Sequence, residues 1–120
     1  MNETWLIPDA YLPAAGDGPP HGHEAVCVLN TGNREAHLTL DLYFEDRPPV
    51  LGIAVTVGPE RSRHLRMDDA EALGGTQVPR ETAYAIRLTA DVPVAVQYSR
   101  LDVAQPNYSL MTTMALPTDA

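Results

Sequence analysis

Proline and glycine divide this sequence into short segments, and that punctuation limits the folds open to it. Eleven prolines and eight glycines occur in the 120 residues, so turn signals recur about every ten residues, as in all-β sandwiches and barrels. Between them the residues alternate, as in AHLTLDLYF at 36–44, where Leu38, Leu40 and Leu42 share one face. We therefore predict an all-β, single-domain sandwich over residues 1–120, with about eight short strands near 4–7, 24–29, 36–44, 52–57, 61–67, 82–90, 92–101 and 109–116.

Two segments carry further structural information. EAVCVL at 24–29 is apolar on both faces, which predicts a central strand covered on each side. MDDAEALGG at 67–75 is the one segment that resembles a helix, with Asp68 or Asp69 as a cap and Gly74 as its end. We expect one short helical turn there at most.

The charge balance argues against one class of partner. The formal net charge is −8, which opposes non-specific binding to nucleic-acid phosphates. All eight cationic residues are arginine, a side chain suited to bidentate contacts with carboxylates and other oxyanions. Arginines are therefore informative where they cluster.

The cysteine content and the first residues predict the compartment. Cys27 is the one cysteine, which excludes an internal disulfide and suits a reducing cytosol. The first 20 residues are proline-rich and lack the basic and apolar regions of a signal peptide. No segment approaches the roughly 20 apolar residues of a membrane helix. We expect a cytoplasmic protein without membrane insertion.

Metal binding and catalysis find little support in the sequence. PPHGHEAV places His21, His23 and Glu24 together before a strand, but a metal site needs a further ligand, and His37 and His64 lie far away in sequence. Cys27 stands in an apolar strand, where a thiol is normally inert, and the sequence has neither a Gly-x-Ser-x-Gly elbow nor a glycine-rich phosphate loop. We expect no enzyme, no metal and no cofactor.

RSRHLRMDD at 61–69 places arginine and histidine on one face. If Leu65 and Met67 point inward, His64 and Arg66 share the opposite face. Such a face could bind anions or hydroxyl groups, and it is equally typical of any exposed strand. Trp5 leaves a similar choice open, since a lone aromatic in a strand is more often core than ligand platform.

VQYSRLD at 96–102 directs two charges toward the core side. The alternation that turns Val94, Val96 and Tyr98 inward puts Arg100 and Asp102 on the same face. A buried charge without a partner costs several kcal/mol, roughly 3–5 kcal/mol for a broken pair, so both groups need partners. Either Arg100 and Asp102 form a structural ion pair, or they meet other charged groups in a polar cleft, such as Glu24, His64 and Arg66.

Several motifs, in the same order, resemble the sensory rhodopsin transducer family, the soluble partners of a cyanobacterial sensory rhodopsin and their bacterial relatives. The matching segments are the early tryptophan, YLPAAGDGP, HEAVCVLN, YFEDRPPV, RHLRMDD, VPRETAYA, PVAVQYSRLD and QPNYSLMTTMA. The resemblance implies a sandwich of jelly-roll type, assembly as a homotetramer, and binding of small molecules such as sugars. It also implies transmission of a signal, and the cyanobacterial member is described as binding DNA.

The resemblance carries over onto particular residues. It matches His23, Glu24, His64, Arg66 and the segment 97–102, in which Tyr98 stands where a histidine is usual. We expect any ligand site among one tryptophan and five polar residues whose side chains suit sugar rings and hydroxyls, namely Trp5, His23, Glu24, His64, Arg66 and Arg100.

The sequence thus predicts a non-enzymatic, transducer-like signalling module. We expect it to bind a small molecule, in particular a sugar, and a protein partner such as a membrane receptor. A nucleic-acid-binding regulator is the alternative, and a metal-dependent jelly-roll enzyme comes third.

Overall fold

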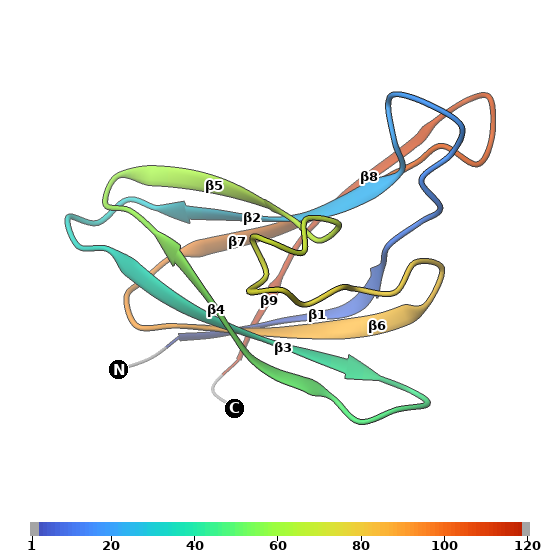
Figure 1. The fold of residues 1–120 in the computed structure, drawn as a ribbon. Coiled ribbons are helices and arrows are strands. Elements are labelled where there is room, and N and C mark those ends of the chain that lie inside the picture. Colours follow the sequence, from blue (N-terminus) through green and yellow to red (C-terminus); the bar gives the residue numbers. More distant parts are fainter. Residues whose placement is uncertain (1–2, 119–120) are drawn as a thin grey trace.

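The computed structural model describes residues 3–118 and consists of two antiparallel sheets packed face to face (Figure 1). One sheet has the strand order β4-β3-β6-β1-β9 and the other the order β5-β2-β7-β8. The strands are β1 (Glu3–Tyr11), β2 (His23–Asn30), β3 (Ala36–Phe44), β4 (Val50–Val57), β5 (Arg61–Arg66), β6 (Ala83–Ala90), β7 (Ala95–Asp102), β8 (Ser109–Met114) and β9 (Leu116–Thr118).

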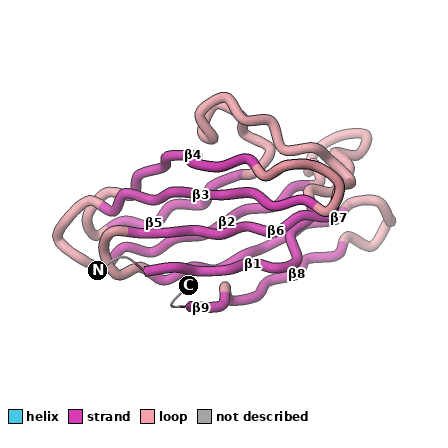
Figure 2. Tube along the Cα trace, turned by 90° about the horizontal axis from the view of Figure 1, so that it is seen from below, coloured by secondary structure: helices cyan, strands magenta, loops and turns pink. Residues whose placement is uncertain are grey.

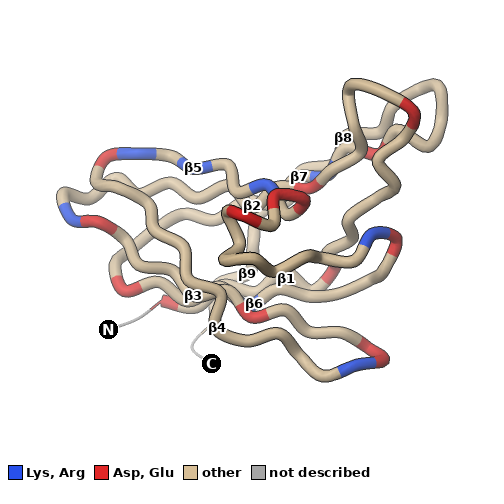
Figure 3. Tube along the Cα trace, viewed as in Figure 1, with Lys and Arg blue, Asp and Glu red and all other residues tan. Residues whose placement is uncertain are grey.

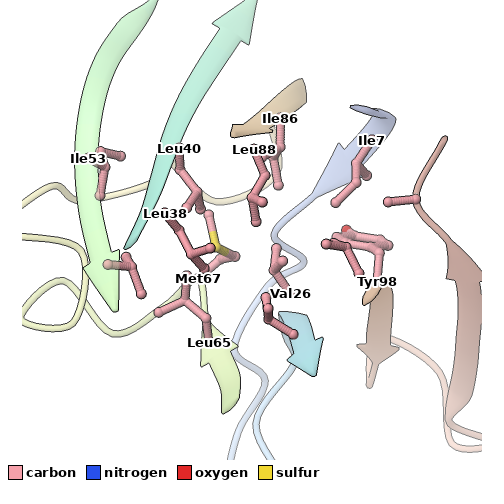
Figure 4. Packing of buried hydrophobic residues seen from close by; sticks show 14 of the residues in the cluster. Ile7, Val26, Leu38, Leu40, Ile53, Leu65, Met67, Ile86, Leu88 and Tyr98 are labelled. Atoms are coloured by element: carbon pink, nitrogen blue, oxygen red, sulfur yellow. The ribbon is translucent and has the colours of Figure 1, made fainter. Parts of the chain in front are cut away.

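The core lies between the sheets, where the alternating residues of each strand meet. Leu38 and Leu40 of β3 and Ile86 and Leu88 of β6 face Val26 and others across the gap, each at most 2% exposed (Figure 4). One face of each strand is thus removed from water, which is the main free-energy gain of a sandwich. The predicted all-β sandwich is confirmed.

The number of strands differs from the prediction at one place, and several strand ends are shifted, most of all in β1, which was expected over 4–7 and spans Glu3–Tyr11. The predicted strand 109–116 is two strands, because β8 pairs with β7 while β9 pairs with β1 in the other sheet. The chain therefore changes sheets at Ala115, which is buried. The structure has nine strands in its described residues where about eight were expected.

The segment 67–75 is a series of turns. Asp69 accepts a hydrogen bond from the Ala72 backbone at 3.3 Å, and Gly74 and Gly75 follow with positive φ. Figure 2 shows strands and loops throughout the described residues, without a helix. None of these residues belongs to a helix able to span a membrane.

The prediction that β2 is a central strand is correct, but the predicted cover on its outer face is incomplete. β2 lies centrally between β5 and β7. Its inward residues are buried, but Leu29 on the outer face is 46% exposed. The outer face of this apolar strand is therefore open to solvent in part within one chain, since Ala25 on the same face is 5% exposed.

Candidate functional site

Glu24 is a buried carboxylate between the two sheets. It is the second residue of β2, faces inward, and is 0% exposed. Its carboxylate accepts hydrogen bonds from the hydroxyls of Tyr98 in its own sheet and Tyr84 in the other sheet, and from the Tyr11 backbone at 3.2 Å. Three donors compensate much of the cost of removing this group from water.

The ionisation of these groups is perturbed by their surroundings. Burial raises the pKa of Glu24, against the opposing effect of the hydrogen bonds from Tyr84 and Tyr98. Burial, followed by the nearby Glu24 carboxylate, raises the pKa of Tyr84 well above its ordinary value, and the same two causes raise the pKa of Tyr98. Both tyrosines therefore remain hydrogen-bond donors at neutral pH.

Arg100 closes this network on the solvent side. Its guanidinium lies 5.6 Å from the ring centre of Tyr11 and 5.5 Å from that of Tyr98. Its Nε donates to the Tyr98 hydroxyl at 3.2 Å, and its Nη2 donates to the Asp9 carbonyl at 3.2 Å. The charge is thus held between two aromatic faces, an arrangement that stabilises a partly desolvated cation.

The partner of Arg100 differs from the expected one. Arg100 pairs with the carboxylate of Asp9 at 3.7 Å, whereas Asp102 accepts a hydrogen bond from the Ala104 backbone at 2.8 Å. The reason lies in β1, whose register shifts between Ile7 and Ala10 and so brings Asp9 alongside. The carboxylate of Asp102, at the end of β7, instead satisfies the first turn of the following loop.

A second polar cluster surrounds a hollow at the same end of the sandwich. Arg66 makes a two-pronged contact with Asp68, with both nitrogen–oxygen distances at 2.8 Å, and Arg80 approaches Asp68 at 3.6 Å. Burial alone would raise the pKa of Asp68, but the hydrogen bonds from Arg66 hold it below its usual value. The hollow has a volume of about 440 Å³ and is lined by Leu12, Met67, Asp68, Ala70, Gln77, Val78, Pro79 and Arg80. We call it the Asp68–Arg80 pocket.

Backbone hydrogen bonds connect the Asp68–Arg80 pocket to Glu24. The Met67 backbone N–H donates to the Glu24 carbonyl at 3.0 Å. Arg80 donates to the carbonyls of Pro13, near the start of the β1–β2 loop, and Gly22, its last residue. The pocket wall and the buried carboxylate therefore rest on the same two segments of chain.

The six expected ligand residues are not brought to one site. Glu24 and Arg100 meet through Tyr98, and Arg66 belongs to the Asp68–Arg80 pocket through its contact with Asp68. His64 is exposed on the outer face of β5, as the inward position of its neighbour Leu65 requires. These positions support two separate clusters.

The remaining two expected residues lie apart from both clusters. The Nδ1 of His23 lies 2.8 Å from the His21 carbonyl. Trp5 packs partly against the core near the start of β1, whereas Glu24 contacts Tyr11 at the end of that strand. The indole Nε1 of Trp5 is buried without a hydrogen-bond partner among the described residues. Among residues 3–118, no group of three or more His, Cys, Asp or Glu side chains is placed to hold a metal ion.

Several participants were missed by the sequence reasoning, although a signal existed for two of them. Tyr98 and Tyr84 both stand at inward positions of alternating strands, and a buried tyrosine hydroxyl needs a partner. Glu24, inward on the adjacent strand, could have been proposed as that partner. Asp68 and Arg80 gave no such signal, since their contact depends on how two loops fold.

The chain is similar to known proteins over most of its length. The family model described as Anabaena sensory rhodopsin transducer matches residues 2–117. The crystal structure of Thermotoga maritima 1070 is similar with a TM-score of 0.84 and 38% identity, covering 95% of this chain and 92% of that one. The structure of the Anabaena sensory rhodopsin transducer is similar with a TM-score of 0.72 and 35% identity, covering 82% of this chain and 94% of that one. The comparison with curated proteins found no match.

Proposed function

Because this chain belongs to the Anabaena sensory rhodopsin transducer family, we propose that it is a signalling module that binds a small hydroxylated molecule and responds to it without catalysing a reaction. The Asp68–Arg80 pocket carries this proposal. It offers an anionic acceptor in Asp68, a cationic donor in Arg80 and an amide in Gln77 around one hollow of about 440 Å³. Pockets of about 300–1,000 Å³ with a few placed polar groups are typical of small-molecule sites.

The chemistry of the lining favours a sugar or a hydroxy acid. Hydroxyl groups both donate and accept hydrogen bonds, so they can use carboxylate, guanidinium and amide together. The side chain of Gln77 makes no hydrogen bond within the described residues and is exposed. Its NH2 donor and its carbonyl acceptor are therefore both available to a ligand. Leu12, Val78 and Pro79 supply apolar wall against which the carbon face of a ring can pack.

The absence of catalysis is supported by the position of Glu24. Its carboxylate is 0% exposed and already accepts hydrogen bonds from two tyrosines and a backbone N–H. A general acid or base must come within hydrogen-bond reach of its substrate, and this carboxylate does not face one.

Calorimetry with a panel of monosaccharides and small hydroxy acids tests the ligand proposal. We expect at least one compound to bind the wild type, and binding to be lost in Ala70→Phe, which fills the pocket. Ala54→Phe, at an exposed position of β4, is the matched control and should bind as the wild type does. Absence of binding to every compound, or equal binding by Ala70→Phe, would reject the pocket as the ligand site.

Assembly as a homotetramer is part of the same proposal. Leu110 is 71% exposed, Met114 60% and Leu116 59%, and they follow one another along β8 and β9, each the last strand of its sheet. A hollow of about 360 Å³ opens beside them, between Leu6–Asp9 of β1 and Met111–Leu116. An exposed apolar edge of this kind is typical of a strand that is covered in an assembly.

Two further elements of the proposal concern partners and compartment. We place the module in the cytoplasm, in keeping with its single cysteine, where a membrane receptor could present a cytoplasmic segment to it. The nucleic-acid alternative is disfavoured by the net charge of −8 and by the pairing of Arg66 with Asp68. Gel shifts at graded salt would reveal it, because phosphate contacts weaken steeply as salt rises.

A further inference from the structure

We propose that the β1–β2 loop (residues 12–22) and the β7–β8 loop (residues 103–108) together form a docking surface for a short, lysine- or arginine-containing segment of a partner protein. The inference rests on the proposed function, since it names where a signalling module would meet that partner. We call this surface the loop tip. Figure 1 shows both loops extending beyond the sheets on the same side of the molecule.

The two loops are packed together as one preformed surface. A Cβ atom on Gly16 would lie 2.7 Å from Cγ2 of Val103, so the loops touch closely at a residue whose φ of +82° also favours glycine. The first loop is closed at its base, where the Gly22 backbone donates to the Ala15 carbonyl at 2.9 Å and Arg80 donates to the Gly22 carbonyl at 3.0 Å. Such bracing lowers the conformational entropy that binding would have to remove.

Between the loops lies a hollow of about 370 Å³ with side chains suited to recognition. Pro19 and Pro20 line it from the first loop, and Pro106 and Tyr108 line it from the second. Tyr108 is 54% exposed, and its hydroxyl has no hydrogen-bond partner among the described residues. Rigid apolar surface beside an amphipathic aromatic ring is characteristic of protein-binding surfaces, where tyrosine is enriched at the energetic centre.

These side chains have no part in holding the fold together. Asp17, Gln105 and Tyr108 are exposed, and the residues of the core cluster lie elsewhere. Asp17 forms no ion pair within residues 3–118, whereas Asp68 and Asp9 are both paired with arginine. The loop tip therefore presents an uncommitted carboxylate beside an uncommitted phenol.

The charge of the loop tip selects the class of partner. Residues 12–22 and 103–108 contain neither lysine nor arginine, and Asp17 is the one acidic residue among them. Figure 3 shows no basic position in the two loops. The whole chain carries a net charge of −8, so long-range attraction also favours a cationic partner. Cytoplasmic loops of membrane proteins carry an excess of lysine and arginine, and a segment of that chemistry fits the hollow and the exposed Asp17.

The loop tip is separate from the other two surfaces described above. The Asp68–Arg80 pocket takes its lining from residues 12, 67–70 and 77–80, and the apolar edge from β8 and β9. The β1–β2 loop contributes to two of these three surfaces, because Leu12 at its base also lines the Asp68–Arg80 pocket. Ligand binding, assembly and docking can therefore be altered one at a time.

Selection from a random heptapeptide display library tests the proposal on the intact chain. We expect selected peptides to be enriched in lysine and arginine, and to lose at least about tenfold in affinity on Asp17→Lys and on Tyr108→Ala. Glu45→Lys, at an exposed position after β3, makes the same charge change away from the loop tip and should leave affinity unchanged. Equal melting temperatures of all four proteins would show that the loops tolerate the substitutions.

Three results would overturn the proposal. Selected peptides could lack basic residues, or could bind the two loop variants as tightly as the wild type. They could also match the chain's own basic segment RSRHLR at 61–66, which would make a second copy the occupant. Calorimetry of the same variants with the pocket ligand separates the two proposals. If the protein binds its pocket ligand but selects no peptides, the loop-tip proposal alone is rejected. If it binds neither a ligand nor a peptide, the signalling proposal is rejected as well.

Discussion

The hydroxyl of Tyr84 in one sheet donates a hydrogen bond to the carboxylate of Glu24 in the other. This contact crosses the interior of the sandwich, and the second tyrosine, Tyr98, binds the same carboxylate from within its own sheet. A polar bridge of this kind fixes the relative position of the sheets, because the donors are satisfied in one arrangement.

Replacing Glu24 should destabilise the fold strongly. Glu24→Ala removes the carboxylate that accepts from the hydroxyls of Tyr84 and Tyr98, which we expect to lower the free energy of unfolding by about 3–5 kcal/mol. The Tyr11 backbone N–H keeps its second acceptor, the Tyr98 hydroxyl at 3.1 Å. Urea denaturation measures the change. Glu45→Ala, at an exposed position, is the control and should change stability by less than about 0.5 kcal/mol. If Glu24→Ala changes the free energy of unfolding as little as the control does, the polar bridge contributes nothing to stability.

The stability difference between wild type and Glu24→Gln should depend on pH. Burial raises the pKa of Glu24 above 4.5, the ordinary value of a glutamate, so the folded protein holds this proton more tightly than the unfolded chain does. The resulting stabilisation is fully present below the unfolded pKa and is lost as pH rises through the folded pKa. We expect wild type to lose stability relative to Glu24→Gln as the pH rises from 4 toward neutrality. A relative gain over that range, in urea denaturation at each pH, would contradict the assignment.

Arg100 should matter for stability through its position between two rings. Arg100→Ala removes hydrogen bonds to the Tyr98 hydroxyl and the Asp9 carbonyl, and we expect a loss of about 2 kcal/mol in the free energy of unfolding. Arg100→Lys keeps the charge but cannot reproduce both contacts, so it should recover part of the loss. Asp102→Ala is the matched control, because Asp102 contacts the next loop instead. A larger loss in Asp102→Ala than in Arg100→Ala would reverse the assignment of partners.

Disrupting the apolar edge should dissociate the assembly. Leu110→Glu or Met114→Glu places a charge among exposed apolar side chains of β8, and burying that charge in an interface is costly. We expect light scattering to give a tetramer mass for the wild type and a lower mass for either variant. Leu51→Glu changes an equally exposed leucine on β4 (61% exposed) and should leave the mass unchanged. A monomeric wild type at micromolar concentration would refute the assembly proposal.

The alternation of apolar and polar residues along the sequence was enough to predict much of the fold. It placed Val96 and Tyr98 of β7 inward together with Val94 just before that strand, and Leu65 of β5 inward together with Met67 just after it. All five are buried. It could not reveal that the segment 109–116 changes sheets at Ala115, since both halves of that segment are locally extended. Which sheet a strand joins depends on distant partners, in this case β7 and β1.

The candidate site was predicted less well for a related reason. Trp5 lies near the start of β1, whereas Glu24 of β2 contacts Tyr11 at the end of β1. This separation depends on how the two sheets stack, which the residue types do not encode locally. The partner of Arg100 is Asp9 because β1 shifts register before Ala10. A bulge of that kind changes which side chains meet without leaving a mark in the hydrophobic pattern.

The order of strands in the larger sheet also bears on how the chain reaches its fold. β1 is flanked by β6 and β9, and Glu3 lies opposite Ala90. During synthesis β1 therefore has no hydrogen-bonding neighbour until β6 has been made, after four intervening strands, and its second neighbour, β9, follows later still. Loop closure over such separations is costly before contacts repay it, which slows folding compared with proteins of local topology. The N-terminal strand is thus the part of this protein most dependent on the completion of the rest.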